Sequence, residues 1–140
     1  MKLTTKGRYA VMAMADLATN ENLKPISLSE ISIRQNISLS YLEQLFVKLK
    51  NNHLVKSVRG SHGGYVLEKK AKDIKLSSII FAVNEEVRTL NCKKNSKKGC
   101  GGRSLKCITH NLWDDLEKHI NGFFENKNLN ELILKQENNF

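Results

Sequence analysis

Apolar side chains recur at helical spacing in the first part of the chain. Between about residues 5 and 19 the spacing predicts one amphipathic helix, whose apolar positions are Tyr9, Met12, Ala13, Leu17 and Ala18. A polar segment that includes Pro25 interrupts the pattern. Ser27 and Glu30 then match a capping box, in which a serine hydroxyl and a glutamate carboxylate bond each other's free backbone amides. The motif predicts a short helix that ends near Gln35.

A third helix is predicted over residues 38–52, after a turn at Asn36 and Ile37. Its apolar stripe has the i, i+3, i+4, i+7 spacing of a helix with one buried face, and consists of Leu42, Leu45, Phe46 and Leu49. The opposite face is polar and consists of Ser40, Glu43, Gln44, Lys48 and Asn51. Two short helices joined by a tight turn are typical of a helix-turn-helix, whose second helix enters the major groove of DNA.

Two side chains on this polar face have the chemistry that base reading needs. A glutamine such as Gln44 can form two hydrogen bonds to adenine, and a glutamate such as Glu43 can accept from the amino group of cytosine. The alternative is an ordinary solvated helix face, which any surface helix presents.

The next segment alternates as strands do. Residues 54–59 are predicted to form one strand and residues 65–67 a second strand that runs back beside it. The sequence Gly-Ser-His-Gly-Gly at residues 60–64 is predicted to form the turn between them. A hairpin directly after a helix-turn-helix is the wing of a winged helix. Arg59 would lie at its tip, where an arginine can enter a narrow minor groove, and the glycines would let the backbone approach phosphates. An ordinary hairpin with a solvated arginine is the alternative.

Three more helices are predicted in the second half, over residues 74–83, from near Cys107 onward, and over residues 129–134. The long middle helix has more apolar positions than one small core needs, namely Ile108, Leu112, Trp113, Leu116, Ile120 and Phe123. The predicted fold is mainly α with a small β-hairpin wing. Residues 1–83 would form a winged helix-turn-helix domain with a connecting helix, residues 84–106 a loop, and residues 107–140 a long helix with a C-terminal segment.

The net charge of the chain indicates what kind of partner this fold binds. The 140 residues carry 23 Lys and Arg against 14 Asp and Glu, a net charge of +9, which suits a polyanion such as nucleic acid. A lysine-rich protein from an AT-rich genome would show the same excess. The apolar runs are too short to span a membrane and no cleavable secretory signal is evident, so we expect a cytoplasmic protein with no membrane contact.

The cysteines Cys92, Cys100 and Cys107 lie within sixteen residues, and His110 follows them. An odd number of thiols without a pairing scheme fits a metal site in a reducing compartment better than disulfides. Zinc sites usually take their ligands as close pairs, and only Cys107 and His110 are so spaced, so zinc is possible but not favoured. Three thiolates and an imidazole would hold a 2Fe–2S cluster. The basic residues between the cysteines would stabilise the thiolates, contact phosphate, or simply be solvated.

Four features resemble the IscR family of iron–sulfur cluster-sensing winged-helix repressors. They are LTTKGRYAVMAMADLA, ISLSYLEQLFVKLK, SVRGSHGGYVL and the three cysteines followed by a histidine, and the resemblance runs from Met1 to about Ile133. It implies a homodimeric bacterial transcription regulator that pairs through the long helix. It also implies repression of iron–sulfur assembly genes while a 2Fe–2S cluster is bound. The cysteine spacers, of seven and six residues, are longer than in the commonest family pattern.

On this basis we expect operator DNA to contact the turn before the third helix, its polar face and the wing. The candidate residues are Ser38, Ser40, Tyr41, Glu43, Gln44, Lys48, Arg59, Gly60, Gly63 and Gly64. An enzyme or an electron carrier is disfavoured because no nucleophile–base pair, phosphate loop or second cofactor motif is visible. A winged-helix repressor stabilised by zinc, or one that responds to redox state or nitric oxide, remains the alternative.

Overall fold

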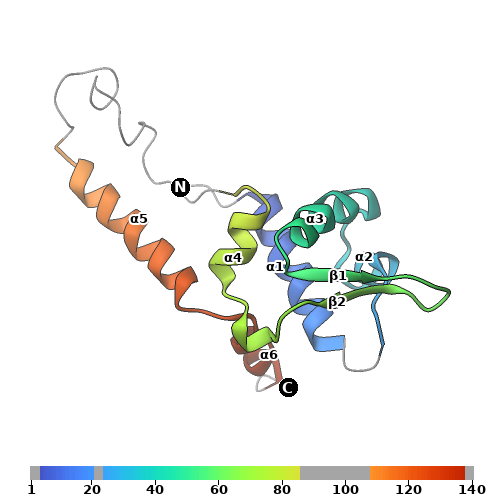
Figure 1. Ribbon diagram of the computed structural model, residues 1–140. Helices are drawn as coiled ribbons and strands as arrows, with labels where there is room; N and C mark the ends of the chain where they lie inside the picture. Colours follow the sequence, from blue (N-terminus) through green and yellow to red (C-terminus); the bar gives the residue numbers. More distant parts are fainter. Residues whose placement is uncertain (1–3, 21–23, 86–107, 138–140) are drawn as a thin grey trace.

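The computed structural model describes residues 4–20, 24–85 and 108–137 of the chain. The predicted ligands Cys92, Cys100 and Cys107 therefore lie outside the described residues. Along the chain the elements are α1 (Thr5–Asn20), α2 (Leu28–Gln35), α3 (Leu39–Asn51), β1 (Val55–Val58), β2 (Gly64–Leu67), the 3-10 helix η1 (Ala71–Asp73), α4 (Leu76–Ala82), α5 (His110–Glu125) and α6 (Leu129–Glu137). The predicted mainly α fold with a hairpin wing is confirmed (Figure 1).

Helix α1 lies at the centre of the core. Its residues Ala10, Ala13, Met14 and Leu17 are fully buried, and the core continues through the apolar stripe of α3 into η1, α4 and α6. Alanine at two of these positions leaves room for neighbouring helices to approach the backbone of α1 closely. This packing, rather than intrinsic helix preference, stabilises helices as short as α2 and α4.

The helix-turn-helix is set by local hydrogen bonds. The Ser27 hydroxyl accepts from the Glu30 amide at 3.2 Å, and the Glu30 carboxylate accepts from the Ser27 amide at 2.9 Å, which confirms the predicted capping box. The bond from the Ser27 amide is the main cause of the lowered pKa of Glu30. Asn36 ends α2 in the left-handed conformation, with φ of 54°, and so turns the chain toward α3.

A buried carboxylate fixes α2 to α1. Asp16 of α1 is only 5 % exposed, and its oxygens accept from Nε and Nη2 of Arg34 at 3.0 and 2.7 Å and from Nε2 of Gln35 at 2.8 Å. The hydrogen bonds to Asp16 raise the pKa of Arg34. Because a buried charge must be matched, this arrangement holds the last turn of α2 in one orientation.

The wing is an antiparallel hairpin in which Val55 pairs with Leu67 and Val58 with Gly64. Strand β2 is attached to the segment before α2, because Ile26 and Tyr65 exchange two backbone hydrogen bonds of 3.0 and 2.7 Å. The Tyr65 ring also packs edge-on against the Phe46 ring, with centroids 4.9 Å apart. The wing is thereby fixed relative to α3.

The prediction of one helix over residues 74–83 is wrong in its first residues. Ile74 and Lys75 are extended, and α4 begins only at Leu76. The reason is tertiary: the Leu129 amide donates to the Ile74 carbonyl and the Leu76 amide to the Lys127 carbonyl, each at 2.9 Å. The first of these bonds uses the Ile74 carbonyl, which a helix beginning at Ile74 would have paired internally. The second satisfies the Leu76 amide, which the start of a helix leaves without an internal acceptor.

The C-terminal helices behave differently from each other. Helix α5 projects away from the body of the molecule, whereas α6 returns to pack beside η1 and α1 (Figure 1). Leu129 at the start of α6 is fully buried in the core, and α6 runs three residues beyond the predicted end. Among the described residues no helix is both long and apolar enough to cross a membrane.

Candidate nucleic-acid interface

The apolar stripe of α3 determines which of its side chains face outward. Leu42, Leu45, Phe46 and Leu49 are at most 2 % exposed, so the helix cannot rotate about its axis without opening the core. Ser40, Glu43 and Gln44 consequently lie on the exposed side. These three predicted DNA contacts share one surface.

The first turn of α3 presents polar groups to solvent. Ser38 precedes the helix, but its side chain does not cap it; the Ser38 hydroxyl instead lies 3.0 Å from the Ser40 hydroxyl. Both residues are exposed. The first amides of a helix have no acceptor within the helix, so this end suits a phosphate oxygen.

Tyr41 and Lys48, the other predicted contacts on α3, are half-buried. The Tyr41 ring packs edge-on against Tyr9 of α1, with centroids 5.8 Å apart. Tyr41 therefore helps to position α3 on α1, a role that the polar pattern of the sequence did not reveal.

The wing places Arg59 at its exposed tip, as predicted. Gly60 has φ of +124°, a conformation that side chains rarely adopt, and its carbonyl accepts from the Gly63 amide at 3.0 Å to close the turn. A Cβ on Gly63 would lie 2.2 Å from the Val58 carbonyl oxygen, and one on Gly64 would lie 2.4 Å from the Ile26 carbonyl oxygen. The last two glycines are thus required by packing, whether or not phosphate approaches them.

Two features of this surface were missed by the sequence reasoning. Val47 of α3 is 57 % exposed although it is apolar, and it lies on the same side as Glu43 and Gln44. The spacing could have revealed it, because Val47 follows Glu43 by four residues and Gln44 by three, and residues so spaced lie on one side of a helix. In addition, Lys50 of α3 donates to the Ser57 hydroxyl of β1 at 3.0 Å, which links the helix to the wing.

Of the four predicted metal ligands, the structure places only His110. It is the first residue of α5 and is half-buried, with Thr109 preceding the helix. Within residues 4–20, 24–85 and 108–137 no three histidine, cysteine, aspartate or glutamate side chains gather as a metal site would require. Ligation by His110 and the three cysteines stays a prediction.

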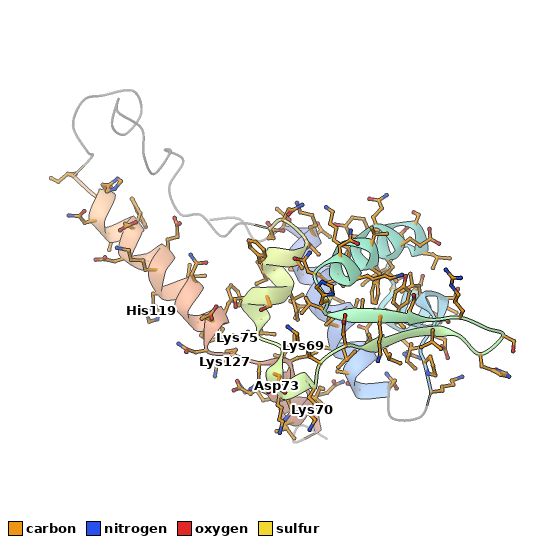
Figure 2. All side chains as sticks on the ribbon, viewed as in Figure 1. Lys69, Lys70, Asp73, Lys75, His119 and Lys127 are labelled. Carbon is orange, nitrogen blue, oxygen red and sulfur yellow. The ribbon has the colours of Figure 1, made fainter. Side chains whose placement is uncertain are left out.

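Lysines also gather away from α3 and the wing tip, where β2, η1 and the α5–α6 junction meet (Figure 2). Several of these charges are paired: Lys75 lies 2.7 Å from Glu125, and Lys127 lies 3.6 Å from Glu131. The hydrogen bond from Lys75 to the Glu125 carboxylate lowers the pKa of Glu125 most, and the hydrogen bond from the Ser77 hydroxyl lowers it further. This group of charges ties α4 to α5 and lies apart from the predicted DNA surface.

A helix-turn-helix with an exposed polar second helix, followed by a hairpin with an arginine at its tip, defines a winged-helix DNA-binding protein. Residues 3–135 match the Rrf2 family, described as iron-dependent transcriptional regulators, and the chain belongs to that family.

Named relatives agree with this assignment. The chain is 52 % identical over 137 residues to the HTH-type transcriptional regulator IscR of Klebsiella pneumoniae (strain 342), an alignment that covers 98 % of this chain and 82 % of the relative. It has the same identity to IscR of Escherichia coli (strain K12 / DH10B), of which 83 % is covered. The protein is a DNA-binding transcription regulator, and its relatives are named regulators rather than enzymes, as the sequence predicted.

Solved structures show the same fold. CymR, the global cysteine regulator of B. subtilis, superimposes with a TM-score of 0.80 at 30 % identity, covering 96 % of this chain and 98 % of that one. IscR of T. potens superimposes with a TM-score of 0.77 at 34 % identity, covering 97 % of this chain and 88 % of that one.

Proposed function

We propose that this regulator is a cytoplasmic homodimer that senses iron–sulfur status and represses iron–sulfur assembly genes. Cys92, Cys100, Cys107 and His110 would hold a 2Fe–2S cluster. The ten candidate residues of the helix-turn-helix and wing would contact operator DNA. The family description, iron-dependent transcriptional regulators, and the relatives named IscR support this proposal.

One observation carries the proposal most directly. His110 is the first residue of α5, and α5 exposes an apolar stripe along the length by which it projects from the molecule (Figure 1). Cys107 precedes His110 by three residues. A cofactor bound there would join the start of the helix that we propose as the dimer contact, so its presence would bear on dimer geometry and hence on the spacing of two recognition helices.

The donor set fits the proposed cofactor. Iron–sulfur clusters are held mainly by thiolates, and histidine replaces cysteine in some of them. When bound, such a cluster supplies a one-electron redox centre that iron supply and oxidants can remove or alter. The residues of this chain would contribute three thiolates and an imidazole nitrogen. Lys93, Lys94, Lys97, Lys98 and Arg103, which lie between the cysteines in sequence, would favour the deprotonated thiols.

The test is the visible spectrum and the iron and sulfide content of the full chain, purified without oxygen. We expect a coloured protein, loss of colour in each of C92A, C100A and C107A, and a weakened or shifted spectrum in H110A. His119→Ala is the matched control, because His119 is an exposed histidine on the same helix (Figure 2). We expect its spectrum to equal that of the wild type.

A colourless wild-type protein containing zinc would contradict the proposal and support the zinc-stabilised repressor. A spectrum, reduction potential and cluster lifetime unchanged in H110A would remove His110 from the ligand set. In a footprinting experiment on operator DNA, we expect the protein to protect two half-sites that are related by a dyad.

A further inference from the structure

Val47 occupies the middle of the surface that α3 exposes. At 3.6 residues per turn, Val47 lies almost directly in line with Ser40, seven residues before it, and is a neighbour of Asn51, four residues after it. Glu43 and Gln44 flank that line one turn earlier. Val47 is thus bordered by exposed polar side chains and lies on the side of the helix away from its buried apolar stripe.

Neither the core nor the helix itself accounts for a valine at this position. The side chain is 57 % exposed, whereas the buried leucines and phenylalanine of α3 are at most 2 % exposed. Valine is also a poorer helix former than leucine, lysine or glutamine, because its branched side chain loses rotamer freedom against the preceding turn. A residue chosen for solubility or helix stability would be polar and unbranched.

The major groove offers a matching apolar group. Each thymine presents its C5 methyl there, beside the O4 acceptor, and apolar side chains recognise thymine through that methyl. A valine suits this contact because its side chain is already restricted at χ1 and loses little entropy when it is covered. The polar neighbours of Val47 would meanwhile bond to base edges and phosphates.

We infer that Val47 is a specificity-determining residue that packs on the C5 methyl of a thymine in the operator. That thymine lies within about two base pairs of the base read by Gln44, since three helical residues separate the two side chains by about 4.5 Å along the axis. The inference rests on the proposed role of α3 as the recognition helix, and it adds a thymine requirement that hydrogen bonding by Glu43 and Gln44 does not supply.

The experiment uses a synthetic duplex that carries the sequence the wild-type protein selects from a randomised DNA pool. Each thymine is replaced in turn, in both half-sites, by deoxyuridine, which lacks only the C5 methyl. We expect one position at which the affinity of the wild-type protein falls about fourfold per half-site. This is the loss in affinity expected when one buried methyl group is removed. Val47→Ala should bind the unmodified duplex weaker by a similar factor and should be insensitive to deoxyuridine at that position.

Two further variants distinguish a failure of the Val47 inference from a failure of the proposed role of α3. Ile33→Ala removes an apolar side chain that is 83 % exposed on α2, outside the α3 surface, and should keep the wild-type sensitivity to deoxyuridine. Gln44→Ala should lose about fivefold or more in affinity if α3 reads bases at all. Unchanged thermal unfolding of each variant shows that the fold is intact.

The inference is overturned if no thymine methyl matters to the wild-type protein, or if V47A remains as sensitive as the wild type at every position. In either case an impaired Q44A would leave the proposed function standing. Wild-type affinity in both Q44A and V47A would instead overturn the role of α3 as the recognition helix.

Discussion

At the scale of single residues, the exposed side chains of α3 differ in what they demand of DNA. Ser40 and Gln44 can both donate and accept hydrogen bonds, so they tolerate several base edges. Glu43 carries a carboxylate, which only accepts, and it is fully on the exposed side of the helix. A carboxylate close to DNA is repelled by phosphates and is rewarded only where a cytosine amino group donates to it.

We therefore expect Glu43 to act mainly by excluding sites that lack this cytosine. Replacing it by alanine should reduce the discrimination between a matched operator and one with that cytosine changed by roughly 1–3 kcal/mol. The affinity for the changed site should rise, while that for the matched site should change less. Competition binding of E43A and wild type to both duplexes at one fixed salt concentration measures this. Equal discrimination by the two proteins would show that Glu43 does not face a base.

At the scale of elements, one carboxylate connects the end of α4 to the start of α1. Glu85 is 8 % exposed, and its carboxylate accepts from the Thr4 hydroxyl, from the Thr4 amide at 3.4 Å and from the Gly7 amide at 3.0 Å. Nearby, the Lys6 ammonium donates to the Asn84 carbonyl at 3.3 Å. A carboxylate at the N-terminus of a helix bonds amides that the helix leaves free, and it is favoured there by the helix dipole.

This contact makes stability depend on pH. Burial raises the pKa of Glu85, but the hydrogen bonds from Thr4 and Gly7 together outweigh it, so the pKa in the folded protein lies below its ordinary value. The folded state thus favours the charged form. Its contribution is complete above the ordinary glutamate pKa and is lost as the pH falls through the lowered folded value.

Glu85→Gln should lower the free energy of unfolding by about 1–3 kcal/mol near pH 7, because charge-assisted hydrogen bonds are replaced by weaker ones. The difference from wild type should shrink as the pH is lowered below the ordinary glutamate pKa. Urea unfolding of both proteins across this range measures it. Glu43→Gln is the control, since that carboxylate is exposed on α3 and its replacement should change the free energy of unfolding little at any pH. A difference for E85Q that stays constant with pH would contradict the assignment to the carboxylate charge.

At the scale of the whole molecule, α5 exposes a large apolar surface that the other described residues do not cover. Leu112 is 59 % exposed, and Trp113, Leu116 and Phe123 on the same side are also exposed. The Trp113 ring is oriented by its bond to the Thr109 hydroxyl at 3.1 Å. An apolar stripe on a projecting helix is typical of an interface with a second copy.

Leu112→Asp should convert the proposed dimer into a monomer, because a carboxylate would be buried without a partner at the contact. Size-exclusion chromatography with light scattering measures the mass, and circular dichroism checks that the helices persist. Asn121→Asp introduces the same charge on the opposite side of α5 and should leave the mass unchanged. Equal masses for L112D and the wild type would place the dimer contact elsewhere.

The sequence by itself determined the features that depend on local interactions. The capping box at Ser27 and Glu30, the amphipathic stripe of α3 and the glycine-containing turn of the wing each involve residues a few positions apart. Their hydrogen bonds and apolar spacing are therefore visible in the order of the amino acids. The same order exposed Glu43, Gln44 and Arg59 as candidates, because the buried stripe fixes what faces outward.

Only the tertiary structure decided the features that join distant segments. The late start of α4 follows from pairing with residues about fifty positions away, and the return of α6 to the core depends on Leu129 fitting beside η1 and α1. The bonds of Asp16 to Arg34 and of Glu85 to Thr4 likewise cross between elements. No local pattern encodes such contacts, since each is selected by the shape and the unpaired polar groups that appear only once the core has packed.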